Sequence, residues 1–124
     1  MSTTNQETDQ QIDIGNGDKI AISLNLNVMR ALQAKYKTYN KWLELMQPAK
    51  GKEVDLDALI FGFREMINEA IEERNDQKPG EEATPLLSEK QVGRIVTRMG
   101  LANAGAQLAK ALVDSTKDDN PKNA

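Results

Sequence analysis

Few side chains in this chain could carry chemistry, because its 124 residues include no cysteine and no histidine. A zinc site of the usual sulfur and nitrogen ligands, a disulfide and a thiol nucleophile are therefore excluded. The best carboxylate pair is Asp55 and Asp57. Both fall where a helix is expected to begin, and the helix dipole stabilises acidic groups there. We interpret them as helix-start residues, and we expect a protein that is not an enzyme and that has no metal or cofactor.

Composition and charge argue against further classes of function. The net charge is −3, from 16 basic and 19 acidic residues, which is unlike a general nucleic-acid binder. Residues 15–17 (GNG) lack the length and the Lys-Ser/Thr ending of a phosphate loop. No apolar run approaches the roughly 20 residues that span a bilayer, and the polar N-terminus does not resemble a signal peptide. We therefore expect no membrane partner and a cytoplasmic location.

The first element that the pattern predicts is a β-hairpin around the sequence GNGD. Apolar residues alternate on both sides of it: Ile12, Ile14, Ile20, Ile22 and Leu24. A three-residue loop over 15–17 pairs Ile12 with Ile20 and Ile14 with Asp18, which places the isoleucines on one face. A two-residue Asn-Gly loop splits them between faces, so the longer loop is the prediction. This face must pack on helices, because a lone hairpin is marginal in water.

Helical periodicity follows, so the predicted fold class is α+β, mainly α, with an N-terminal hairpin and about four helices. The expected helices cover 28–46, 55–75, 88–99 and 103–115. Asp55 is the expected N-cap of the second helix, Ser88 and Gln91 have the spacing of a capping box, and Asn103 can cap the fourth. We expect a single domain over 12–115, a flexible N-terminal arm over 1–11 and a flexible tail over 116–124.

Phe61 fits its surroundings least, because it lies outside the apolar face of its helix. Either the hairpin or the N-terminal arm covers it, or it is an aromatic anchor for a partner or a second copy. Trp42 and Leu45, at the edge of the preceding apolar stripe, are further candidate partner-binding residues. Charges are also uneven, since residues 28–46 are mainly basic and 56–75 mainly acidic. These are either two solvated faces or surfaces that attract each other, within a molecule or between copies.

Residues 88–115 also permit a helix-turn-helix, with a turn at Gly100. A DNA-reading second helix needs polar or basic side chains. This one offers Gln107 and Lys110 among alanines and leucines, while Arg94 and Arg98 lie on the helix before it. A DNA-binding regulator is therefore kept as an alternative, together with a generic helical interaction module.

Three stretches, in this order, resemble the tail assembly chaperones of long-tailed bacteriophages and prophages. They are KIAISLNLNVMRALQAKY, VDLDALIFGFREMINEAIEE and LLSEKQVGRIVTRMG, the last followed by an Ala-rich helix. The likeness covers roughly residues 12–115. It implies a non-enzymatic protein in the cytoplasm of the bacterial host, absent from the finished particle, and a homo-oligomer is compatible with it. The implied partners are the helical tape-measure protein, which such proteins keep soluble, and the tail-tube protein, which they help to recruit. The helix-turn-helix alternative then corresponds to a small prophage regulator.

Overall fold

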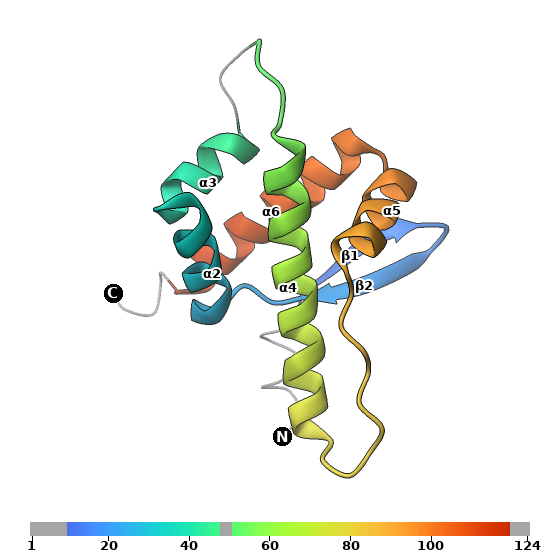
Figure 1. The fold of residues 1–124 in the computed structure, drawn as a ribbon. Helices are drawn as coiled ribbons and strands as arrows, with labels where there is room; N and C mark the ends of the chain where they lie inside the picture. Colours follow the sequence, from blue (N-terminus) through green and yellow to red (C-terminus); the bar gives the residue numbers. More distant parts are fainter. Residues whose placement is uncertain (1–9, 48–50, 120–124) are drawn as a thin grey trace.

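The computed structural model describes residues 10–47 and 51–119, with side chains described as far as 114. In chain order the elements are β1 (Gln10–Gly15), β2 (Asp18–Ile22), α2 (Leu26–Tyr36), α3 (Tyr39–Met46), α4 (Leu56–Gln77), α5 (Glu89–Met99) and α6 (Leu101–Asp119). The predicted class, mainly helical with an N-terminal hairpin, is confirmed (Figure 1). Regular structure begins inside the expected arm and continues into the expected tail; the rest of both segments, 1–9 and 120–124, lies outside the described residues.

The hairpin has the predicted pairing of Ile12 with Ile20, but its loop is shorter than predicted. Gly15 pairs with Asp18, so Asn16 and Gly17 form a two-residue turn, both at positive φ, as the favoured hairpin turn requires. The predicted pairing of Ile14 with Asp18 is wrong, because Ile14 is the extra residue of a β-bulge. Because the bulge adds one residue to β1, the two-residue turn does not split the isoleucines between the two faces of the hairpin. Ile12 and Ile14 are therefore both buried.

The expected helix over 28–46 is two helices, so the described part of the chain has five helices rather than about four. The break is at Lys37, which has φ 78°, and Thr38 then caps α3 by accepting a hydrogen bond from the Lys41 backbone N–H. The apolar stripe continues across the break, because Val28 and Leu32 of α2 and Trp42 and Met46 of α3 are buried. Periodicity alone therefore did not reveal the turn.

Helix α4 forms the centre of the fold and packs against β2, α2, α3 and α5. Its start is as predicted: the Asp55 carboxylate accepts a hydrogen bond of 2.9 Å from the Ala58 backbone N–H. Its buried side includes Ala58, Leu59, Gly62, Phe63, Met66, Ile67 and Ala70. Helix α2 runs antiparallel to it, because the start of α2 (Asn25) bonds to the late residues Glu69 and Glu73.

Helices α5 and α6 complete the core. The predicted capping box is present: Ser88 and Gln91 exchange side chain-to-backbone hydrogen bonds. Gly100, at φ 89°, ends α5 as expected, but α6 begins directly at Leu101. The prediction that Asn103 caps the last helix is therefore wrong, and Asn103 lies inside it. The buried side of α6 is formed by Ala104, Leu108, Ala111 and Leu112, and the helix packs on β1. No helix in the described ranges is long and apolar enough to cross a membrane.

Candidate functional site

Phe61 lies at the centre of a group that we call the Phe61 cluster: Lys35, Tyr36, Phe61 and Arg64. Lys35 is exposed, and the other three side chains are half-buried. The Tyr36 and Phe61 rings meet edge to face, with centroids 5.9 Å apart. The Lys35 Nζ lies 4.7 Å, and the Arg64 Cζ 5.7 Å, from the Phe61 centroid. Phe61 is thus partly covered by the C-terminal end of α2. The expectation that the N-terminal arm covers it falls mostly on residues 1–9, which lie outside the described residues. The antiparallel packing of α2 on α4 creates this contact.

Two polar atoms of the cluster are shielded from solvent and have no hydrogen-bond partner within the described part of the chain: the Tyr36 hydroxyl and the Arg64 Nε. The Arg64 Nη2 instead bonds to the Glu65 carboxylate at 3.1 Å. Burial raises the pKa of Tyr36, and the nearby carboxylates of Asp55, Asp57 and Glu89 raise this pKa further. The phenol is therefore protonated at neutral pH, so the cluster offers aromatic contact, cations and hydrogen-bond donors.

The other two candidate contact residues do not belong to this surface. Trp42 is fully buried, and its indole Nε1–H donates a 3.0 Å hydrogen bond to the Ala58 carbonyl. The interpretation of Trp42 as an edge residue is therefore wrong, because the turn between α2 and α3 directs this side chain into the core. Leu45 is partly buried and packs against the core, and its carbonyl accepts a hydrogen bond from the Asp55 N–H.

Asp55 and Asp57 lie at the start of α4, as predicted. Asp55 is the N-cap and Asp57 occupies the first turn. The described residues contain no group of three or more Asp and Glu side chains that could hold a metal ion. The positions of both carboxylates are accounted for by the helix start.

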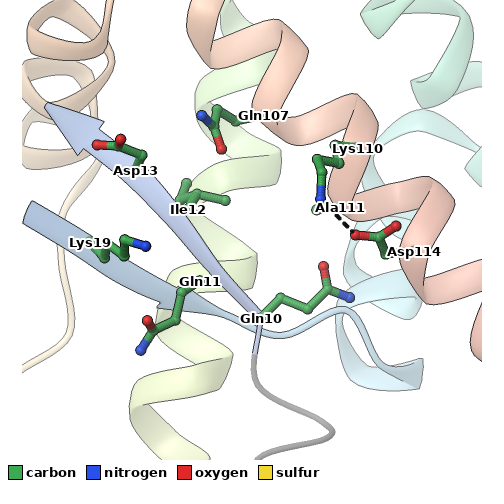
Figure 2. Close-up of a pocket in the computed structure, with 9 residues that line it drawn as sticks. All are labelled: Gln10, Gln11, Ile12, Asp13, Lys19, Gln107, Lys110, Ala111 and Asp114. Atoms are coloured by element: carbon green, nitrogen blue, oxygen red, sulfur yellow. Dashed lines mark hydrogen bonds and ion pairs between the residues drawn. The ribbon is translucent and has the colours of Figure 1, made fainter. Parts of the chain in front are cut away.

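A polar hollow of about 450 Å³ lies beside the contact between β1 and α6. Across it, Gln10 to Asp13 of β1 lie opposite Gln107, Lys110 and Asp114 of α6 (Figure 2). Lys110 pairs with Asp114 at 3.4 Å, and Arg98 of α5 binds the Gly15 carbonyl and the Asp18 carboxylate of the hairpin. Arg98, Lys110 and Gln107, which a helix-turn-helix would use to contact DNA, thus contact or face other residues of this chain.

Sequence reasoning missed a second feature of α4, a clamp on the segment Thr84–Leu87. The Asn68 side-chain amide exchanges two hydrogen bonds, of 2.8 and 3.0 Å, with the backbone of Leu87. Asn75 makes the same pair of bonds with Thr84, both at 3.0 Å. Two asparagines seven residues apart share one side of a helix, and this spacing is the signal that could have suggested the clamp.

Comparison with known proteins finds no matching family model, no matching curated protein and no matching solved structure. A functional assignment for this chain therefore depends on the sequence resemblance and on the surface described above.

Proposed function

We propose that this protein is a phage tail assembly chaperone, a non-enzymatic protein of the host cytoplasm that binds the tape-measure protein and helps recruit tail-tube subunits. It is not part of the mature virion. The proposal combines the order of the three resembling stretches with one structural observation, the Phe61 cluster. Aromatic residues and arginine are enriched at protein interfaces. A chaperone for a long helical client needs contact surface and many copies rather than a catalytic pocket.

The geometry supports a DNA-binding regulator less well. Arg98 is bound to the hairpin, Lys110 is paired with Asp114, and Gln107 faces the hollow. A recognition helix needs such side chains to reach base edges and phosphates. A generic interaction module would also use the Phe61 cluster, and it differs from the chaperone only in its partner.

Co-expression of the full chain with a tape-measure protein tests the proposal. We expect a complex and a larger soluble fraction of the client. Phe61→Ala should reduce both while lowering the melting temperature little, because the ring is only half-buried. Val113→Ala, at an exposed position on α6, is the matched control.

The possible results separate the alternatives. If no complex forms and client solubility does not change, the chaperone proposal fails. If Phe61→Ala leaves binding intact but causes a large loss of melting temperature, Phe61 is a core residue instead. Salt-sensitive binding to duplex DNA would favour the regulator.

A further inference from the structure

Helices α5 and α6 are joined by a single residue, Gly100, whose φ of 89° and ψ of 138° are not helical. Helical hydrogen bonding nevertheless reaches this residue from both sides. The Gly100 N–H donates to the Val96 carbonyl, and the Gly100 carbonyl accepts from the Ala104 N–H, both at 2.9 Å. The break between the helices therefore lies in the two backbone dihedrals of one residue, and glycine adopts negative φ as readily as positive φ.

Rotation of Gly100 to helical dihedrals would join α5 and α6 into one helix over 89–119. The N–H groups of 101–103 would then bond to the carbonyls of 97–99, which are hydrogen bonds that a break in the helix interrupts. Helix α5 would keep its place, because Arg98 beside the joint binds the Gly15 carbonyl and the Asp18 carboxylate of the hairpin. The straightened joint would therefore move α6 alone.

The apolar sides of the two helices do not align in such a continuous helix. In α5 the buried residues are Val92, Val96 and Met99, and in α6 they are Ala104, Leu108, Ala111 and Leu112. At about 100° per residue, the directions of these two sides differ by about 140°. With α5 in its own core, the apolar side of α6 would therefore face away from this core and would need another cover.

The cover that fits α6 is the surface that it occupies in the structure, formed by β1 and α5. Polar side chains of α6 bond along the helix itself, Lys110 to Asp114 and Gln107 to Asn103, so these pairs would move with it. A second copy whose own α6 has left presents an identical surface of β1 and α5. The contacts of α6 are then kept without any new complementarity, and short joints favour such an exchange between copies.

We infer that two copies of this chain exchange α6, so that each α6 covers β1 and α5 of the other copy, with Gly100 as the joint that straightens. The Phe61 cluster belongs to α2 and α4, which keep their places in the exchange. It therefore stays open to a client, and a dimer offers two such clusters. The inference goes beyond the proposed function and does not depend on it.

Sedimentation equilibrium of the purified full chain tests the exchange without a client, after incubation in dilute urea and dialysis at each concentration so that α6 can detach and rebind. We expect a monomer–dimer equilibrium. Gly100→Ala should lower the dissociation constant about a hundredfold, because alanine disfavours the positive φ of the monomer and favours the continuous helix at both joints of the dimer. Gly105→Ala is the matched control, since this glycine is helical in both forms and the dissociation constant should not change.

Introduced thiols distinguish an exchanged dimer from a surface contact, because the chain has no cysteine of its own. Gln10 of β1 and Lys110 of α6 line opposite walls of the polar hollow (Figure 2). Chains with Gln10→Cys are mixed with chains with Lys110→Cys and taken through the same urea step. A short bifunctional thiol reagent should then join one chain to the other in the dimer fraction.

Contrary results are defined by the same geometry. A wild-type chain that stays monomeric at every concentration overturns the inference, as does a dimer in which the thiol reagent joins no two chains. Equal responses to Gly100→Ala and Gly105→Ala also overturn it. Circular dichroism checks that Gly100→Ala keeps its helices; if this variant does not fold, the cross-link between otherwise wild-type chains decides. Because no client takes part, failure here leaves the chaperone proposal standing.

Discussion

Helix α4 is held by two neighbours in opposite ways. Near its N-terminal end, the Trp42 indole of α3 lies directly on Gly62 and bonds to the Ala58 carbonyl. Near its C-terminal end, Asn68 and Asn75 hold the segment Thr84–Leu87 by side-chain amides. The first contact is buried and combines ring packing with one hydrogen bond, whereas the second is part-buried to exposed and consists of hydrogen bonds.

The difference lies in what each contact recognises. The Trp42 contact depends on side-chain shape, because a Cβ added at Gly62 would lie 3.0 Å from the indole Cε2 and closer still to Cζ2. The clamp recognises only backbone N–H and C=O groups. Seven helical residues rise about 10.5 Å, and three extended residues span about 10 Å, so the two asparagines match Thr84 and Leu87 in spacing. The close packing of Trp42 therefore limits which residue can stand at position 62, whereas the clamp places no such limit on the side chains of the segment Thr84–Leu87.

The largest effect on the free energy of unfolding is expected from adding a methyl group at Gly62, where the Trp42 indole packs. Gly62→Ala should lower the free energy of unfolding by about 1–3 kcal/mol, because overpacking displaces Trp42. This loss should appear although alanine favours a helix over glycine by about 1 kcal/mol. Urea unfolding measures both this variant and its control, Gly105→Ala.

Gly105 is the matched control because it also lies in a helix and, apart from its chain neighbours and the backbone of its own helix, no atom of the described residues lies within 4 Å of the position of an added Cβ. Here the same substitution should raise stability by about 0.5–1 kcal/mol, from helix propensity alone. Equal effects of the two substitutions would mean that the Trp42 contact is not the constraint on Gly62.

Much of the fold could be predicted from the sequence because its signals are local. The Asp55 cap, the capping box at Ser88 and Gln91, and the stop at Gly100 each depend on residues within one turn of the helix end. The pairing of Ile12 with Ile20 followed from the alternation of buried residues. Local rules of this kind are independent of the tertiary fold.

The wrong predictions concern places where a local sequence pattern fits two structures, or where a contact between residues far apart in the sequence determines the structure. The apolar residues keep their helical spacing across the turn at Lys37, so the periodicity predicts one helix where there are two. The same turn places Trp42 in the core. The bulge at Ile14 allows a short loop and a buried isoleucine together. For the candidate site, the outward position of Phe61 could be predicted from helix geometry. Its cover by Tyr36 could not, because that contact joins residues 25 positions apart.

A smaller effect is expected from breaking the clamp. Asn68→Ala should cost about 1–3 kcal/mol, because it leaves part-buried backbone groups of Leu87 without partners. Asn75→Ala, at an exposed site, should cost about 0.5–1.5 kcal/mol. Thr84→Ala should stay within about 0.5 kcal/mol, since the clamp binds the backbone of Thr84 and not its side chain. Urea unfolding orders the three variants, and a Thr84→Ala loss as large as that of Asn75→Ala would contradict backbone recognition.

A small effect at neutral pH is also expected at Tyr36, whose hydroxyl lacks a hydrogen-bond partner in the described ranges. Tyr36→Phe should change the free energy of unfolding by less than about 1 kcal/mol there, because no hydrogen bond is lost. At alkaline pH, the free energies of unfolding of the wild-type chain and of Tyr36→Phe should differ. Burial of the ring, and then the carboxylates of Asp55, Asp57 and Glu89, raise the pKa of Tyr36 in the folded chain. The unfolded chain therefore loses the Tyr36 proton first, at a pH of about 10. Above this pH the unfolded chain binds fewer protons than the folded chain.

Stability should thus fall as the pH rises from about 10 through the higher pKa of the folded state, and Tyr36→Phe should lessen this fall. Tyr39→Phe is the control, because burial alone raises the pKa of Tyr39, which stacks on Trp42 at a centroid distance of 5.8 Å. Both substitutions should reduce the alkaline loss, but only the Tyr36 effect should shrink when Asp57 is replaced by Asn. Urea unfolding from about pH 8 to pH 11 gives the slopes. An alkaline slope that Tyr36→Phe does not change would mean that neither burial nor the carboxylates of Asp55, Asp57 and Glu89 raise the pKa of this hydroxyl.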